Sequence, residues 1–178
     1  SLLAKAYFIR ATAWQSKDDF SRAIADFNKA ILLDSGFALA YMWRAAVRDA
    51  QGDYDGAIAD YSQAIRLNPQ DAGAYNNRAC AFNAKGEFEK AILDLETALR
   101  LDPAMYAALV NRGYVAVGEG NFAQAAEHFA RAMRIKPAGA YDLLWYYVAQ
   151  ARSGSYTAKV SAAQTELADR SARLTDAP

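Results

Sequence analysis

Four arginines recur at intervals of 34 residues, and an ionisable side chain follows each of them sixteen residues later. The arginines are Arg10, Arg44, Arg78 and Arg112, and the residues that follow them are Asp26, Asp60, Asp94 and His128. Because a guanidinium and a carboxylate can form a bidentate ion pair, the pattern predicts a repeated Arg–Asp pair. In the last copy the histidine would be neutral or a weaker partner. The alternative is a row of arginines that binds an acidic ligand.

The position of the aspartates favours ion pairs over an anion-binding row. Asp60 follows the small residue Ala57 by three positions and precedes Ala64 by four, so all three lie on one face of a helix. A charge on such a buried face needs a partner. Since the carboxylates recur with the period of the arginines, we expect each pair to form within a copy or between adjacent copies.

Cysteine and histidine are scarce, and no arrangement of residues typical of a catalytic or metal site stands out. The chain contains one cysteine, Cys80, and one histidine, and it has neither a glycine-rich phosphate-binding motif nor a cluster of metal ligands. A single cysteine excludes an internal disulfide and a cysteine-built zinc site. No histidine lies near Cys80 in its own copy, which argues against a reactive thiol. The sequence predicts a protein that is not an enzyme and that carries no cofactor or metal.

Charge and hydropathy argue against two classes of partner. Lys and Arg total 20 and Asp and Glu total 20, so no overall field attracts nucleic acid or an anionic membrane. No apolar run reaches the roughly 18 residues of a membrane helix, and no signal-peptide pattern is present. We expect no nucleic-acid partner and no membrane span. The chain starts at Ser1, as a trimmed sequence would, which leaves both a cytoplasmic and a bacterial periplasmic location open.

The elements that would position these residues repeat with the same period. In the copy from residue 38 to 71, two helical patterns flank Gly52-Asp53, and Asn68-Pro69 closes the second pattern. Small residues recur at three places where two helices could approach closely: Ala11, Ala45, Ala79 and Gly113; Ala23, Ala57, Ala91 and Ala125; Ala30, Ala64, Ala98 and Ala132. Each copy is therefore predicted to form a hairpin of two antiparallel helices.

This pattern resembles the tetratricopeptide repeat, a family of 34-residue helical hairpins. Its copies cover 4–37, 38–71, 72–105 and 106–139. The resemblance implies an all-α fold, a right-handed superhelical solenoid of antiparallel helix hairpins, with a single domain over 1–178 and a capping segment at 140–178. The departures from the family pattern are Asp18 for the turn glycine, Ser35 for the proline, and Arg48 and Ala116 for an aromatic residue. None of them is expected to prevent folding.

In this family the first helix of each hairpin lines a concave face, and fixed places on that helix point into the groove. The second copy has Leu39, Met42, Trp43, Ala46, Asp49 and Ala50 at these places, and the third has Gly73, Asn76, Asn77, Cys80, Asn83 and Ala84. Amides can bond to an extended peptide backbone, and large apolar side chains can form pockets for its anchors.

The candidate peptide-binding residues that follow from this geometry are Phe8, Met42, Trp43, Asn76, Asn77, Asn83, Asn111 and Tyr114. The alternative is that the asparagines simply suit a solvated helix. Some family members grip a C-terminal carboxylate with paired lysines, an arginine and asparagines. Here only Lys5 and the asparagines match that set, so the missing basic residues argue against such a clamp.

Beyond residue 139 the repeat continues for only one more helical pattern. Its apolar residues leave no polar side for solvent: Tyr141, Leu143, Leu144, Trp145, Tyr146, Tyr147 and Val148. Something has to cover this helix. We favour the segment 156–173 folding back onto it, and the alternatives are residues after Pro178 or a second chain.

Three functions remain. The first is a protein–protein interaction adaptor or scaffold that binds a peptide or a partner protein in the concave groove, the ordinary work of this family. The second is a structural module that forms a homodimer through the aromatic 141–148 helix. The third is the recognition arm of an exported bacterial lipoprotein-type adaptor. The sequence does not identify the ligand.

Overall fold

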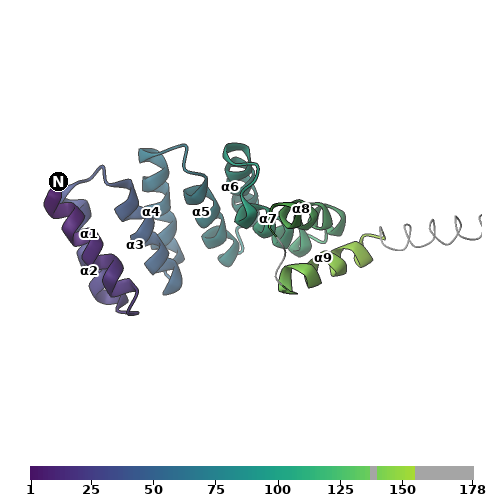
Figure 1. Ribbon diagram of the computed structural model, residues 1–178, viewed down its shortest axis with the longest axis horizontal. Helices are drawn as coiled ribbons and strands as arrows, with labels where there is room; N and C mark the ends of the chain where they lie inside the picture. Colours follow the sequence, from purple (N-terminus) through teal and green to yellow (C-terminus); the bar gives the residue numbers. More distant parts are fainter. Residues whose placement is uncertain (137–139, 155–178) are drawn as a thin grey trace, which may run out of the picture. The chain divides into compact units, whose positions relative to one another are not determined.

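The computed structural model describes residues 1–136 and 140–154. Within these ranges the chain forms nine α-helices and no strand (Figure 1). They are α1 (Leu2–Gln15), α2 (Phe20–Leu33), α3 (Ala38–Ala50), α4 (Tyr54–Leu67), α5 (Ala72–Ala84), α6 (Phe88–Leu101), α7 (Tyr106–Gly118), α8 (Phe122–Ile135) and α9 (Ala140–Arg152). The first eight helices fall as pairs into the four predicted copies, so the prediction of an all-α chain of helix hairpins is confirmed.

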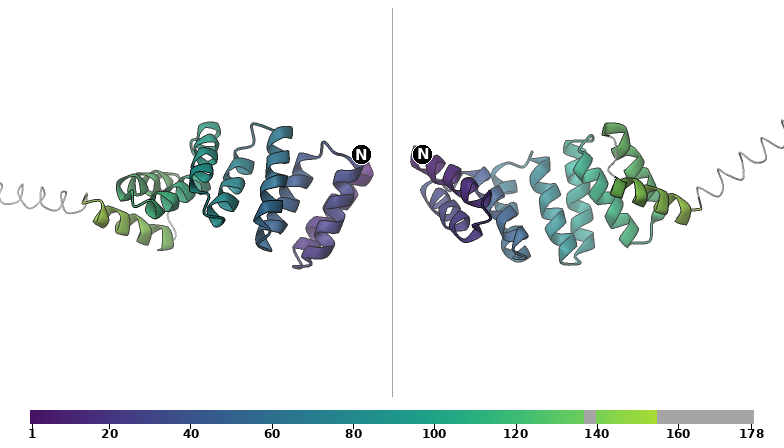
Figure 2. Two further views of the ribbon diagram at one scale, coloured as in Figure 1. Left: turned by 180° about the vertical axis from the view of Figure 1, so that it is seen from behind. Right: turned by 60° about the horizontal axis from the view of Figure 1, so that its bottom comes forward.

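The chain divides into two compact units, Ser1–Ala108 and Leu109–Pro178, with the boundary inside α7. In the first unit α1 packs on α2, α3 on α4 and α5 on α6, and neighbouring hairpins meet through α2 with α3 and α4 with α5 (Figure 2). The first helices also form a continuous row, because α3 contacts both α1 and α5. In the second unit α8 packs on α9. A single domain over 1–178 stays a prediction.

The hairpin turns depend on one residue with a left-handed backbone. Asp18 has φ of 59°, and the residues at the same place in the later copies have φ of 80°, 75° and 75°: Gly52, Gly86 and Gly120. Glycine adopts this conformation without strain, and aspartate is among the few other residues that tolerate it. The next helix is then capped, because Asp19 accepts a hydrogen bond from the Arg22 amide at 3.1 Å. The first hairpin therefore closes without a turn glycine, as predicted.

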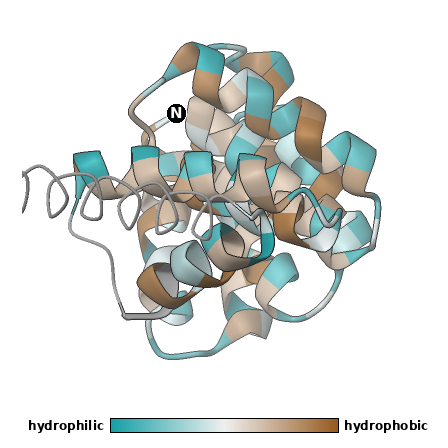
Figure 3. Cartoon of the chain, turned by 90° about the vertical axis from the view of Figure 1, so that its right-hand side faces the viewer, coloured by the Kyte–Doolittle hydropathy of each residue, from teal (hydrophilic) through white to brown (hydrophobic). Residues whose placement is uncertain are grey.

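The small residues predicted at the helix contacts are buried. Ala11, Ala45 and Ala79 are at most 1% exposed. The second helix of each hairpin contributes a large side chain that is also buried: Phe27, Tyr61 and Leu95. Gly113 occupies this place in the fourth copy, and a Cβ there would lie 2.7 Å from the ring of Phe129. The apolar interior thus runs as a ribbon between helices, and Figure 3 shows apolar and polar stretches alternating along them.

Helix α9 contains the aromatic segment predicted from the sequence. Ala149 is buried, and the ring of Trp145 lies 6.3 Å from that of Tyr114. Leu144 and Tyr147 are 57% and 53% exposed, so the other described residues leave part of the apolar surface of α9 uncovered. The segment 156–173, which we expected to cover it, lies outside the described residues.

Candidate functional site

Three Arg–Asp pairs lie in the first unit, one in each hairpin. Arg10 binds Asp26 through Nε and Nη2 at 2.6 and 2.8 Å, and Arg78 binds Asp94 through the same two nitrogens at 2.7 Å each. The aspartates are buried, and the hydrogen bond from Arg10 lowers the pKa of Asp26. The predicted pairing of arginine with aspartate is confirmed, and each pair forms within its own copy.

The central pair has a second arginine. Asp60 accepts hydrogen bonds from Arg44 at 2.8 and 2.5 Å and from Arg48 at 2.8 Å. From the sequence, Arg48 stood out only as a departure from the family's aromatic residue. Its position four residues after Arg44, on the same helical face, was the signal that the two arginines could share one carboxylate.

The same arginines connect neighbouring hairpins. The remaining guanidinium nitrogen of Arg44 donates to Asn28 on α2 at 2.5 Å, and that of Arg78 donates to Ser62 on α4 at 2.9 Å. Each arginine is thus bonded to its own hairpin and to the preceding one. With their guanidinium groups engaged in this way, Arg44 and Arg78 are explained by the stacking of the hairpins and do not form a row that is open to an acidic ligand.

The fourth pair, in the second unit, is different. Arg112 is buried, and its carboxylate partner is Glu119, with Nη1 and Oε2 3.4 Å apart. Burial lowers the pKa of His128, and the charges of Arg112 and Arg131 lower it further. The Nδ1 atom of His128 is buried without a hydrogen-bond partner among the described residues. Of the two roles considered for His128, the structure supports the neutral one.

Three of the predicted peptide-binding residues line one pocket in the first unit. Met42 and Trp43 from α3 and Asn77 from α5 surround it together with Ala46, and its volume is about 190 Å³. The pocket lies in the row of first helices, and Trp43 is 40% exposed. Two neighbouring repeats are therefore needed to form it.

The other predicted residues have different surroundings. The ring of Phe8 lies 5.0 Å from Phe37 and 6.5 Å from Trp43, so Phe8 supports the wall beside Trp43. Asn76 is buried and donates a hydrogen bond to the Asn77 side-chain oxygen at 3.1 Å. Asn83 is exposed.

Two predicted residues belong to the second unit. Tyr114 packs against Phe129, with ring centroids 5.2 Å apart, and against Trp145. Asn111 is half-buried on the same helix, α7. Tyr114 therefore contributes to the aromatic interior of its own unit.

Asp49 and Cys80 were recognised as groove positions but were not selected as binding residues. Asp49 is half-buried on α3, and burial raises the pKa of its carboxyl group. Burial and the charge of Asp49 raise the pKa of the Cys80 thiol to about 11. A thiol with so high a pKa is protonated at neutral pH, so it is a poor nucleophile. The sequence contained one signal that Asp49 lacks a local ion-pair partner: no Lys or Arg stands three or four residues away on its helix face.

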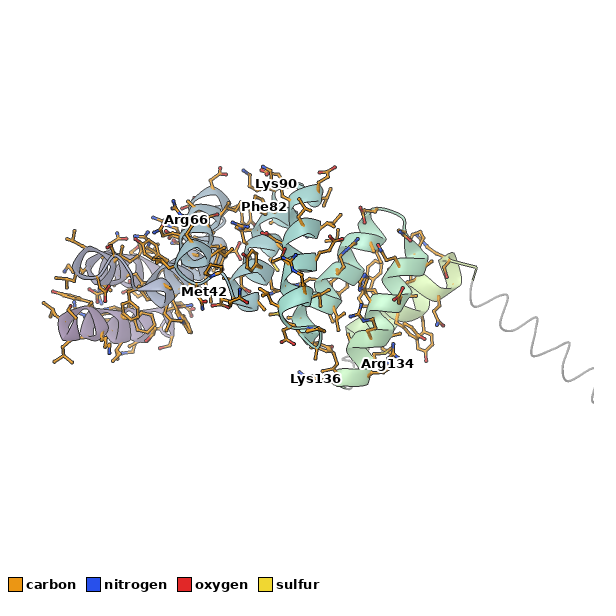
Figure 4. All side chains as sticks on the ribbon, turned by 90° about the horizontal axis from the view of Figure 1, so that it is seen from above. Met42, Arg66, Phe82, Lys90, Arg134 and Lys136 are labelled. Carbon is orange, nitrogen blue, oxygen red and sulfur yellow. The ribbon has the colours of Figure 1, made fainter. Side chains whose placement is uncertain are left out.

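Two other surface features include none of the predicted peptide-binding residues. A pocket of about 260 Å³ is lined by Leu3, Ala6, Tyr7 and Arg10 of α1. On another surface, Lys90 lies beside Phe82, with its ammonium nitrogen 5.4 Å from the ring centroid (Figure 4).

Within residues 1–136 and 140–154, no group of three or more His, Cys, Asp or Glu side chains could hold a metal. No helix in these ranges is long and apolar enough to cross a membrane.

Three stretches of the chain match models of a known repeat. Residues 4–37 and 76–140 match models described as tetratricopeptide repeat, and residues 50–82 match one described as TPR repeat. No curated protein sequence resembles the chain at a significant level.

Solved structures share the fold at low sequence identity. A crystal structure of MamA is 20% identical, with a TM-score of 0.79 over 99% of this chain and 96% of that one. PilF of Pseudomonas aeruginosa is 21% identical, with a TM-score of 0.78 over 87% of this chain and 71% of that one. YrrB, described as a TPR protein with an unusual peptide-binding site, is 23% identical, with a TM-score of 0.69 over 83% and 76%.

Proposed function

Because the chain is a tetratricopeptide repeat protein, we propose that it is an interaction adaptor that binds a peptide segment of a partner protein on its row of first helices. The pocket formed by Met42, Trp43, Ala46 and Asn77 carries this proposal. It combines an apolar wall with a side-chain amide, and an extended peptide needs both kinds of contact. The description of YrrB, which shares the fold, supports peptide binding as a use of this architecture.

The size of the pocket suits one side chain. Its volume of about 190 Å³ is below the roughly 300–1,000 Å³ of small-molecule and cofactor sites. An apolar residue of the peptide would pack against Met42 and Trp43. The Asn77 amide would bond to the peptide backbone beside this anchor, because an amide offers a donor and an acceptor together.

The residues behind the pocket hold its walls in place. Arg44 lies next to Trp43 in the chain and binds Asp60, and Arg78 lies next to Asn77 and binds Asp94. These pairs anchor α3 to α4 and α5 to α6, while the bond from Arg78 to Ser62 connects the two hairpins. A groove whose walls are already ordered loses less conformational entropy when a peptide binds.

The proposal is tested by removing the pocket without unfolding the chain. The Trp43→Ala, Asn77→Ala double variant should lose capture of partner chains from a lysate of the source organism while its helical circular dichroism is unchanged. A Phe88→Ala, Gln70→Ala variant is the matched control, since Phe88 is 46% exposed and lies outside the pocket. Undiminished capture by the double variant would reject the groove as the binding surface.

A second candidate function is self-association through α9. The exposed side chains of Leu143, Leu144 and Tyr147 favour it. Light scattering over a range of concentrations distinguishes the two functions, because a monomer at every concentration would rule out a dimer of this kind. The third hypothesis, an exported recognition arm, stays a prediction.

A further inference from the structure

A carboxylate lies next to the proposed anchor pocket. Asp49 follows Ala46 by three residues and Met42 by seven, which places it on the same face of α3, one and two turns away. Its charge reaches across the row of first helices, because it contributes to the raised pKa of Cys80 on α5. It also contributes to the raised pKa of Tyr61 on α4. Asp49 therefore lies beside the pocket, on the face of α3 that lines it.

This carboxylate has no partner among the described residues. The three buried aspartates of the first unit, Asp26, Asp60 and Asp94, are all bonded to arginine, but the side chain of Asp49 makes no hydrogen bond or ion pair with any described residue. Its neighbour Arg48 is engaged elsewhere, with Asp60 and Asp53. A half-buried charge without a partner is costly, and here burial raises its pKa.

The charge next to the pocket is acidic. At the groove places of the second and third copies Asp49 is the only charged residue: Leu39, Met42, Trp43, Ala46 and Ala50 accompany it, with Gly73, Asn76, Asn77, Cys80, Asn83 and Ala84. An acidic peptide would meet repulsion here. A cationic side chain would replace the water lost from the carboxylate with a charge-assisted hydrogen bond.

We propose that the peptide bound in this groove carries a lysine or arginine beside its apolar anchor, and that Asp49 binds that cation. This inference rests on the proposed function and specifies its ligand. The cation and the anchor would recognise the peptide together, because each occupies a defined place on α3.

The spacing on α3 predicts the spacing in the peptide. With a rise of about 1.5 Å per residue, Asp49 lies roughly 5–10 Å along the helix from the residues that line the pocket. In an extended peptide, side chains two residues apart lie on one side and about 6.6–6.8 Å apart. The predicted motif is therefore an apolar residue and a lysine or arginine two residues apart, in either order.

Fluorescence polarisation with synthetic octapeptides tests this motif. Each peptide carries one leucine and one lysine in a glycine–serine background, with the two residues one to four positions apart in both orders. Matched peptides carry glutamine or glutamate in place of lysine. The lysine peptide with a spacing of two should bind best, and its glutamine counterpart should bind about tenfold more weakly, as expected for one lost charge-assisted hydrogen bond.

Variants of the protein assign the preference to Asp49. Asp49→Asn should bind the lysine and glutamine peptides equally well, and its unfolding midpoint at pH 7 should be no lower than that of the wild type, because the substitution removes a charge that pairs with no described residue. Asp55→Asn removes an exposed carboxylate that pairs with Lys85 and does not line the pocket, and it should keep the lysine preference.

The failures of the two proposals can be told apart. If the peptides bind but Asp49→Asn retains the preference for lysine, or Asp55→Asn loses it equally, the cation site is wrong and the groove stands. If no peptide binds, or if binding survives Trp43→Ala with Asn77→Ala, the groove proposal fails and the inference about Asp49 fails with it.

Discussion

The first three copies and the fourth use the same positions in different ways. In the first three, an alanine packs at the helix contact and the arginine beside it binds a buried aspartate. In the fourth, glycine replaces the alanine and a neutral histidine replaces the aspartate: Gly113 and His128. The hairpin forms in both cases. The comparison shows that the Arg–Asp pair between the two helices is not required for the hairpin to form.

The most sensitive position should be Asp60. Replacing it by alanine leaves both Arg44 and Arg48 without their shared carboxylate, which should cost about 3–5 kcal/mol of unfolding free energy. Urea denaturation measures this loss. Asp55→Ala is the control, since that side chain is 83% exposed and its removal should change stability by no more than about 1 kcal/mol. Equal small losses for both variants would show that the arginines are solvated.

The glycine of the fourth copy should not accept a methyl group. In Gly113→Ala the new Cβ would lie 2.7 Å from the Phe129 ring, so the loss should be about 1–3 kcal/mol. In Gly118→Ala, on the same helix, the new Cβ meets no described atom within 4 Å apart from its chain neighbours and its own helix backbone, and the variant should be neutral or stabilised by up to about 1 kcal/mol. Thermal unfolding of both variants checks the difference. A Gly113→Ala variant as stable as the wild type would show that the ring moves without cost.

An aspartate in place of His128 should make the fourth copy resemble the others. His128→Asp places a carboxylate beside the buried Arg112, and the new charge-assisted hydrogen bonds should stabilise the fold by about 1–2 kcal/mol at pH 7. His128→Asn is the control, because it is polar but uncharged. If the aspartate variant is less stable than the asparagine variant, the cost of burying the carboxylate exceeds its attraction to Arg112.

The smallest predicted effect is the pH dependence of the unfolding free energy that His128 causes. Burial holds the pKa of His128 below its ordinary value of 6.5, so the folded state favours the neutral imidazole. Its contribution to stability is therefore present above about pH 6.5 and is lost as the pH falls toward the folded pKa. Unfolding free energies at pH 7.5 and pH 5 should differ more in the wild type than in His128→Gln. If the change in unfolding free energy between pH 7.5 and pH 5 is the same in the wild type and in His128→Gln, the histidine titrates normally.

The sequence was sufficient to predict the hairpins and the Arg–Asp pairs, because both repeat with the same 34-residue period. Small residues and carboxylates spaced by three and four positions define a buried helical face, so Asp26, Asp60 and Asp94 could be matched to their arginines. Asp18 could be placed in a turn because few residues other than glycine adopt that backbone. Gly113 looked like an ordinary member of the small-residue series, because the nearness of Phe129 depends on packing between two helices.

The candidate site was less predictable. Met42, Trp43 and Asn77 were selected from the family's groove positions, but the sequence did not show that they share one pocket across two repeats. Arg48 was taken for a departure from the pattern, and it binds Asp60. Asp49 was one groove position among many until the structure showed a half-buried carboxylate without a partner among the described residues.

The amino-acid sequence by itself determined where the helices begin and end, which face of each is buried and which charges share that face, because these properties depend on neighbours within about one turn of the chain. Only the tertiary structure decided which side chains from different helices meet. Arg44 shares Asp60 with Arg48, Phe129 excludes a side chain at position 113, and Asn77 joins Met42 and Trp43 around a pocket. Distances across a helix contact depend on how two surfaces interlock, and the spacing along one chain does not contain that information.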